Sequence, residues 1–360
     1  MSQHSRNIPS LDLLRSFAIA TVVLAHSVLA FGAPAALAPL QMGGVGVDLF
    51  FLLSGWLLGR QLMQELRSSG RIGLTRFWTR RWLRTLPAYY AVLLFTFGQQ
   101  VVLKGNYSLS WSYLFFGQNY LTNLPYLYVS WSLCVEEHFY LLIGPLLLLA
   151  FWLRRKGILL LSVVLLVPVV CRTAGWYGDL VETHVRFDEC LVGVCLAGLS
   201  VFAPAIWKTL CRFAPWIAGI GLSIFAAMIW QRWHPEWSGW FPDEQTLCVF
   251  VFGSFILLAV SNDDWKQRLY VPGATYLAKR AYSVYLLHPE ATALLRYADL
   301  SSFVVFFLLT WLLTLAGAEI LYRLVEKPLM DARERLNVSR STPPAQRTQE
   351  QSLTGRATRL

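Results

Sequence analysis

Ten long apolar runs constrain the fold of this chain more than any other feature of its sequence. A helix needs about 20 predominantly apolar residues to cross the hydrocarbon core of a bilayer. Runs of about this length lie near residues 10–32, 44–64, 86–103, 131–153, 157–175, 187–206, 213–231, 244–260, 275–295 and 302–324. Because backbone polar groups in lipid must be satisfied internally, these runs predict an all-α, polytopic membrane protein with about ten transmembrane helices.

The composition excludes a soluble domain and gives no sign of a metal centre. The chain is 56% hydrophobic and 14% charged, whereas soluble domains average about 45–50% apolar and about 25% charged residues. Its 15 Trp, 15 Tyr and 22 Phe fit aromatic belts at two membrane interfaces. The six cysteines form no CxxC pair, so neither a metal site nor a disulfide framework is expected.

The basic residues lie mainly in the short breaks between the apolar runs, which is typical of a membrane orientation signal. The formal net charge is +10. If the N-terminus lies in the cytoplasm, the inner segments hold 25 of the 31 Lys and Arg residues, as the positive-inside rule requires. An even number of spans returns the C-terminus to the same side. We therefore expect both termini in the cytoplasm, the lipid bilayer as the surroundings and no nucleic-acid partner.

The chain divides into one membrane domain and a polar tail. Residues 1–332 hold every apolar run and form the expected transmembrane domain. Residues 333–360 are polar without apolar periodicity and are expected to be a disordered cytoplasmic tail. Within the domain, only 65–84 and 104–130 are expected to be long connections. We expect the first apolar run to be retained and not cleaved as a signal peptide, because charged residues interrupt its start.

The first apolar run carries an arginine and a histidine on one helical face. Arg15 and His26 are eleven residues apart, so on a helix they return to within about 20° of each other and are separated by about 16 Å along the axis. Ionisable residues within spans usually face a bundle interior or a watery cavity. The pair, with Asp12 nearby, is therefore a candidate site in which His26 suits a general base. The alternative is an interfacial arginine anchor and a histidine hydrogen-bonded to a neighbour.

A second cluster of basic residues precedes the third apolar run, in RFWTRRWLRTLPAYY (76–90). On a helix Arg80 and Arg84 are i,i+4 neighbours, and Arg81 lies on an adjoining face. One interpretation is a positive-inside flank attracted to anionic lipid. The other is an anion clamp, because arginine forks recognise phosphate groups well.

Acidic residues open the second and fourth apolar runs. Asp48 follows several glycines, which permit close backbone approach, and a helix-capping role explains this acid by itself. In VSWSLCVEEHFYLL, Ser132 can cap the fourth span. Glu136 and Glu137 are adjacent and point in different directions, so at least one is expected to face the bundle.

Four further residues place polar or charged groups in or beside later spans, and together they outline a polar interior: Arg186, Asp188, His288 and Glu326.

Seven segments together resemble the acyltransferase-3 family of integral membrane O-acyltransferases. They run in order from about residue 8 to 332 and are LDLLRSFAIATVVLAHS, GVGVDLFFLLSG, RRWLRTLPAYY, WSLCVEEHFYLL, RFDECLVG, AYSVYLLH and LYRLVEKP. Members of this family have ten-span domains that move an acyl group, commonly acetyl from acetyl-CoA, to hydroxyl groups of carbohydrates. The resemblance implies the same fold and reaction class, and a place in a bacterial inner membrane.

The resemblance also implies roles for particular residues. The family's motif of an arginine and a histidine separated by ten residues falls on Arg15 and His26, and its paired-arginine motif falls on Arg81 and Arg84. The glutamate of its SLxVEExFY segment falls on one of the pair 136–137. Both residues of the first motif are regarded as essential in the family.

These correspondences imply a mechanism that depends on acyl-CoA. The arginine pair, supported by Arg80, would hold the phosphates of acyl-CoA at the cytoplasmic face, and Arg15 would lie along the thioester arm or orient its carbonyl. His26 would take the proton from the acceptor hydroxyl, while Glu136, Glu137 or Asp48 orients it or balances its charge. An acyl-His26 intermediate is a variant. The expected partner is a carbohydrate or glycolipid acceptor such as exopolysaccharide or O-antigen.

Two other classes of protein share the general pattern. Ten spans with buried charge also describe transporters of polar or anionic solutes, which often show repeated halves with broken helices. A scaffold of a polysaccharide assembly complex would have no turnover of its own. Transfer of label from acetyl-CoA into polysaccharide distinguishes an acyltransferase from both.

Overall fold

The computed structural model of the chain consists of helices joined mostly by short connections. It describes residues 8–332 apart from 106–107, 122, 125, 238, 240–242 and 262–269. The α-helices are α1 (Pro9–Ala30), α2 (Gly46–Ser69), α3 (Leu74–Lys104), α4 (Trp131–Leu153), α5 (Arg155–Thr173), α6 (Phe187–Phe202), α7 (Pro204–Trp233), α8 (Glu244–Ser261), α10 (Ala274–Leu295) and α11 (Phe303–Leu321). Short 3₁₀ or π turns are η1 (Ala35–Val45), η2 (Trp111–Tyr113), η3 (Gln118–Tyr120), η4 (Tyr128–Ser130), η5 (Thr183–Val185), η6 (Pro235–Trp237), η7 (Arg296–Ala298) and η8 (Tyr322–Glu326). No described residue lies in a β-strand, so the all-α prediction is confirmed.

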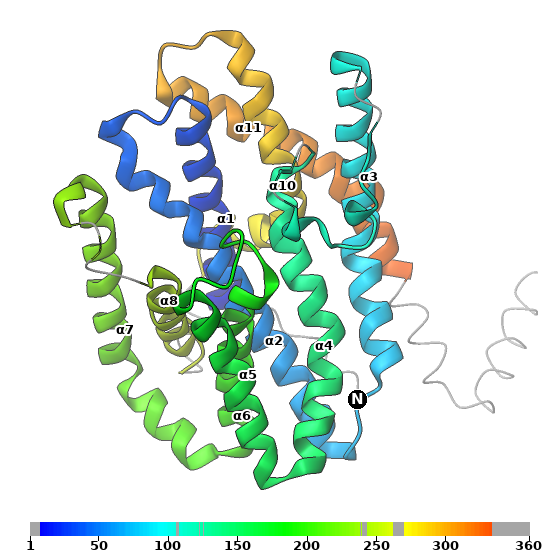
Figure 1. The fold of residues 1–360 in the computed structure, drawn as a ribbon, viewed down its shortest axis with the longest axis vertical. Helices are drawn as coiled ribbons and strands as arrows, with labels where there is room; N and C mark the ends of the chain where they lie inside the picture. Colours follow the sequence, from blue (N-terminus) through cyan, green and yellow to red (C-terminus); the bar gives the residue numbers. More distant parts are fainter. Residues whose placement is uncertain are drawn as a thin grey trace, which may run out of the picture.

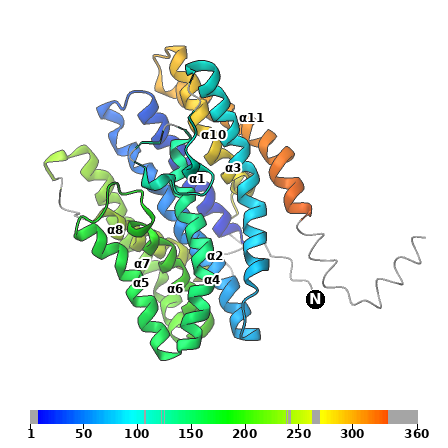
Figure 2. The same cartoon turned by 45° about the vertical axis from the view of Figure 1, so that its right-hand side comes forward.

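The helices form one bundle, with α2 running obliquely through its middle (Figure 1). α2 packs most extensively against α6, whereas α1 packs against both α2 and α10. In the turned view, α5, α6, α7 and α8 lie on one side of the bundle, and α3, α10 and α11 lie on the other (Figure 2). α1 and α2 therefore join the two groups of helices, and α1 lies beside α10 although the two are far apart in the sequence.

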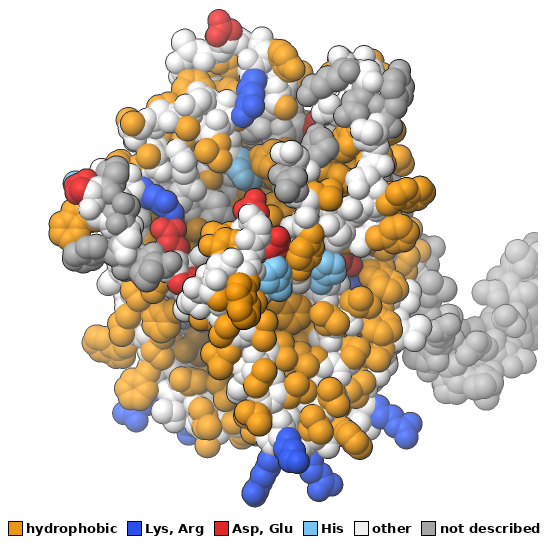
Figure 3. All heavy atoms as spheres, viewed as in Figure 1, with side chains coloured by type: hydrophobic (Ala, Val, Ile, Leu, Met, Phe, Trp, Pro, Cys, Tyr) orange, Lys and Arg blue, Asp and Glu red, His pale blue; other side chains and the backbone are white. Residues whose placement is uncertain are grey.

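Eight segments of the described chain are long and apolar enough to cross a membrane. They are α1, η1 with α2, α3, η4 with α4, α5, α7, α8, and α11 with η8. The other two predicted runs are also helical, but α6 has only 16 residues and α10 carries two basic residues and a histidine. Large apolar side chains cover much of the face seen in Figure 3, as expected of an integral membrane protein. The total of ten crossings stays a prediction.

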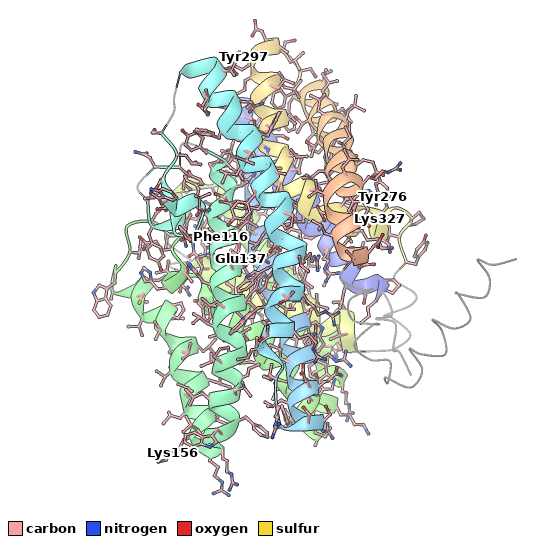
Figure 4. All side chains as sticks on the ribbon, turned by 90° about the vertical axis from the view of Figure 1, so that its right-hand side faces the viewer. Phe116, Glu137, Lys156, Tyr276, Tyr297 and Lys327 are labelled. Carbon is pink, nitrogen blue, oxygen red and sulfur yellow. The ribbon has the colours of Figure 1, made fainter. Side chains whose placement is uncertain are left out.

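Basic side chains gather at the lower end of the bundle (Figure 3). Figure 4 places Lys156 at this end and Tyr297 at the opposite end. The Lys156 end is the one that the distribution of charge predicts to face the cytoplasm, and this sidedness stays a prediction. The polar tail predicted at 333–360 lies outside the described residues.

The connection predicted over residues 65–84 is wrong, because almost all of it is helical. α2 continues to Ser69, where Gly70 adopts a left-handed conformation (φ +67°) and its N–H bonds to the Leu66 carbonyl. α3 then begins at Leu74. Arginine is a good helix former, so the polar stretch extends both helices instead of separating them. Arg80, Arg81 and Arg84 consequently project from one continuous helix, α3, at fixed spacing.

The other predicted long connection, residues 104–130, lies between the end of α3 at Lys104 and the start of α4 at Trp131, and its described residues include three 3₁₀ turns. Its Gln118 and Asn119 are buried, and Asn119 donates a hydrogen bond of 2.9 Å to the hydroxyl of Thr183. Tyr113 is also buried, and burial raises the pKa of its phenol to about 12. The segment is therefore anchored in the bundle by neutral polar side chains.

Glycines allow α2 to approach its neighbours closely. A Cβ added at Gly43, just before α2, would lie 2.2 Å from the carbonyl oxygen of Thr21 on α1. One added at Gly55 would lie 1.9 Å from the carbonyl oxygen of Cys190 on α6. The close backbone approach predicted for the glycines before the second span is therefore present, and α2 is fixed against both helices.

Candidate active site

His26 of α1 and His288 of α10 contact each other through their ring nitrogens. His26 Nδ1 lies 2.6 Å from His288 Nε2, and the ring centroids are 4.9 Å apart with an angle of 4° between the planes. His288 is fully buried, whereas His26 is half-buried. The Tyr128 ring packs edge-on against His26 at a centroid distance of 5.5 Å. One nitrogen of His26 is therefore occupied by His288, and Nε2 is the nitrogen that remains for a substrate.

Arg15 lies on α1 about three turns before His26, about 16 Å away along the helix axis. Its Nη1 atom is 3.4 Å from Asp12 Oδ1, which is a long ion pair. The Arg15 side chain keeps 26% of its surface accessible, compared with 8% for Asp12. Arg15 is thus held by a weak local contact and remains partly open, as a residue that meets a ligand would be.

Arg84 of α3 connects Arg15 to carboxylates from two other elements. The charges of Arg84 and Arg15 repel each other, and Arg84 is attracted to Glu136 of α4 and Glu326 of η8. Figure 4 places Lys327 and Glu137 at similar heights, so the end of η8 meets the bundle at the level of the α4 carboxylates. Four elements therefore bring alternating charges together around Arg84.

The two adjacent glutamates of α4 contact different neighbours. Glu136 accepts hydrogen bonds from Ser54 of α2 (2.7 Å) and from the Tyr140 hydroxyl (3.0 Å). Glu137 accepts one from Thr85 of α3 (2.7 Å) and is buried. Both carboxylates therefore face the inside of the bundle, and the half-buried Glu136 is the more accessible of the two.

The arginine cluster lies on α3 facing α2 and α4. Arg81 Nη2 lies 3.4 Å from Gln61 Oε1 on α2, and its charge acts on both Glu136 and Glu137. Arg80 is half-buried on the same turn. Guanidinium groups from two successive turns of α3 thus lie near the carboxylates and near Arg15.

A separate network of buried charges joins α2, α5 and α6. Arg186 donates to Asp48 (2.8 Å) and lies 3.0 Å from Glu189. Arg172 makes two hydrogen bonds to Asp188, of 2.8 and 3.1 Å. Because these groups pair with one another, we interpret Asp48, Arg186 and Asp188 as ties between helices. For Asp48 this differs from the charge-balancing role considered from sequence.

Two other predicted residues have partners on α10. The prediction that Ser132 caps the fourth span is wrong, because α4 begins at Trp131 and a cap must precede the first helical residue. The Ser132 hydroxyl instead lies 2.6 Å from that of Tyr285. Glu326 is buried and accepts a hydrogen bond from Ser283 of α10.

Several polar residues of the site were not predicted from the sequence. Tyr140 follows Glu136 by four residues, so helical spacing could have identified it as a neighbour. Ser54, Thr85 and Tyr128 come from other elements and have no such local signal. Among the described residues, no group of three or more His, Cys, Asp or Glu side chains is arranged to hold a metal ion.

Comparisons of the sequence with a family pattern and with curated proteins agree on one family. The sequence pattern of the acyltransferase-3 family, described as an acyltransferase domain, matches residues 8–323. The chain is 26% identical, over 90% of its length and 57% of the relative, to a Staphylococcus aureus (strain COL) protein named "Putative O-acetyltransferase SACOL0978". It is also 26% identical to the peptidoglycan O-acetyltransferase OatA of Listeria monocytogenes, over 80% of this chain and 50% of that protein.

The chain spans about half the length of these curated relatives. No solved structure matches it. The family match covers α1 to α11, including the arginines of α1 and α3, the two glutamates of α4 and both histidines, whereas Glu326 lies just beyond it. The chain therefore belongs to the acyltransferase-3 family of integral membrane proteins.

Proposed function

We propose that this chain transfers an acyl group, most simply acetyl, from cytoplasmic acyl-CoA to a hydroxyl group of a carbohydrate or glycolipid acceptor. Membership of the family and the names of the relatives support this reaction class. The observation that carries the proposal is the arrangement along α1, where one face joins the Arg84 cluster at Arg15 to the histidine pair at His26. Such a path suits a donor whose phosphates and thioester lie far apart.

The arginines of α3 would bind the phosphates of the donor. These side chains suit phosphate because the guanidinium groups of Arg81 and Arg84 present planar forks of N–H groups that match phosphate oxygens. Arg80 lies beside them. Repulsion between Arg84 and Arg15 also favours an anion near both, because an anion between two cations lowers their mutual repulsion. Arg15 would then lie along the thioester arm of the donor.

His26 would act as the general base. Its Nε2 atom takes the proton of the acceptor hydroxyl while the hydroxyl oxygen bonds to the thioester carbonyl carbon. The carbon–sulfur bond breaks, and His26 returns the proton to the departing sulfur, so that the products are the acyl ester and free CoA. Glu136 would balance positive charge beside the donor. Attack by His26 itself would instead give an acyl-histidine, which would be trapped and detected in the absence of acceptor.

The decisive experiment follows label from acetyl-CoA into carbohydrate in membranes containing the full chain. His26→Ala is expected to lower transfer by about 100- to 10,000-fold, the usual contribution of a general base. The control is His234→Ala, since His234 is an exposed residue at the end of α7 that pairs with Glu236. Near-normal transfer by His26→Ala would exclude the base role, and no transfer by the unaltered chain would favour a transporter or a scaffold.

A further inference from the structure

The contacts of His288 determine which of its ring nitrogens carries hydrogen. Its Nδ1 atom lies 3.3 Å from the carbonyl oxygen of Val284, one turn earlier in α10. A carbonyl oxygen can only accept a hydrogen bond. His288 Nδ1 must therefore carry the hydrogen.

The sequence leaves a second backbone acceptor free beside this ring. In an α-helix, the carbonyl of Tyr285 would accept the N–H of residue 289, four positions later. Residue 289 is proline, which has no N–H. The Tyr285 carbonyl is consequently left without its helical donor, and it favours hydrogen on the neighbouring His288 ring.

The hydrogen on Nδ1 in turn fixes the state of His26. A neutral imidazole has one N–H and one lone pair, so the Nε2 atom of neutral His288 presents a lone pair to His26 Nδ1, 2.6 Å away. The alternative is a doubly protonated His288, but this side chain is fully buried, and burying a charge is costly. His26 Nδ1 therefore donates, and the lone pair of His26 lies on Nε2.

We propose that His288 is a positioning residue for His26: it selects the tautomer in which the Nε2 lone pair of His26 faces the acceptor hydroxyl. This inference rests on the proposed role of His26 as the base. His288 takes no proton from the substrate. When His26 becomes charged during the reaction, its Nδ1–H continues to donate to His288, as an imidazolium does to the carboxylate of a catalytic triad.

The surroundings of the pair hold this arrangement in place. The Tyr285 hydroxyl donates to the carbonyl of Val129 (2.9 Å) and contacts the Ser132 hydroxyl (2.6 Å), which fixes this part of α10 against the start of α4. Tyr128 packs edge-on against His26. Both rings are therefore restricted, and His26 cannot exchange its two nitrogens by rotating freely.

The first test reads the tautomer directly. Full-length protein with ¹⁵N-labelled histidine, in lipid, is studied by NMR, in which protonated and unprotonated ring nitrogens have separate shifts; the His26 signals are assigned from their loss in His26→Gln. We expect hydrogen on Nδ1 and none on Nε2 of His26 in the unaltered protein. Hydrogen on Nε2 would overturn the proposal whatever the activity, and this readout needs no stable His288 variant.

The second test compares two substitutions of His288. In His288→Gln the side-chain amide oxygen lies near the former Nε2 position and can still accept from His26, so we expect kcat to fall by less than about 10-fold. In His288→Leu no acceptor remains, and we expect kcat to fall by at least about 100-fold with an unchanged KM for acetyl-CoA, as when a triad loses the group that sets the histidine tautomer. His234→Gln is the matched control. Equal losses in Gln and Leu variants, or an unchanged His26 tautomer in His288→Leu, would refute the positioning role.

The two tests also separate this inference from the proposed function. If His26→Ala keeps near-normal transfer, the base role fails while the NMR result still reports the tautomer. If His26→Ala loses transfer but His288→Leu does not, the base role stands and only the role of His288 is wrong.

Discussion

Arg186, immediately before α6, donates a hydrogen bond of 2.8 Å to Asp48 at the start of α2, and their side chains are only 8% and 5% exposed. Two charges so deeply buried depend on each other, because removing one leaves the other unpaired in a medium of low polarity. The guanidinium also lies over the Trp131 ring, 5.3 Å from its centroid. The pair therefore ties the beginnings of α2, α4 and α6 together.

Arg186→Met is expected to destabilise the protein by about 3–5 kcal/mol, the usual cost of breaking a buried ion pair. The measurement is thermal or denaturant unfolding in detergent, and the double variant Asp48→Asn/Arg186→Met should regain part of the loss. Arg232→Gln serves as control, because its pair with Glu244 is exposed by 42% and 30% and should contribute less than about 1 kcal/mol. Equal effects at the two pairs would contradict the interpretation.

Arg84→Gln is expected to weaken binding of CoA by about 10- to 100-fold, since hydrogen bonds to charged groups contribute about 1.5–3 kcal/mol. Arg84→Lys keeps the charge but loses the planar fork, so it should fall between Gln and the unaltered protein. Isothermal titration with CoA measures both. The control is Arg154→Gln, at the exposed turn between α4 and α5, which should leave the affinity for CoA unchanged. If Arg154→Gln weakened CoA binding as much as Arg84→Gln, the protein would attract anions only in general.

Glu136→Gln is expected to lower kcat/KM more than Glu137→Gln. Glu136 is half-buried and is attracted to both Arg81 and Arg84, whereas Glu137 is buried against Thr85. Loss of the Glu136 charge therefore leaves the positive charges of Arg81 and Arg84, in the proposed acetyl-CoA site, less balanced. Steady-state acyl transfer at varied acetyl-CoA tests the order, and a larger effect of Glu137→Gln would reassign the site carboxylate.

Gly55→Ala is expected to destabilise the contact between α2 and α6 by at least about 1–3 kcal/mol, the usual range for overpacking. The added Cβ would lie 1.9 Å from a backbone carbonyl oxygen of α6, which cannot move aside as a flexible side chain would. Gly98→Ala is the matched control, because nothing lies within 4 Å of the added Cβ on α3; it should stabilise the helix by about 0.5–1 kcal/mol. Unfolding midpoints of the two variants should therefore shift in opposite directions.

The sequence by itself determines the features that depend on composition and helical period. The lengths of the apolar runs place the helices, and the spacing of eleven residues places Arg15 and His26 about three turns apart on α1. The same local reasoning fails at element boundaries. Residues 65–84 contain many polar side chains but are helical apart from 70–73, since polarity ends a span and does not by itself end a helix.

Only the tertiary structure decides which distant groups meet. His26 and His288 are 262 positions apart in the sequence, and Ser54 and Glu136 are 82 positions apart. No helical period therefore relates the members of either pair. Their contacts follow from the packing of α1 against α10 and of α2 against α4. The choice of tautomer at His26 depends on the packing as well, because the Val284 carbonyl of α10 acts on His26 through His288, and only where the two helices touch.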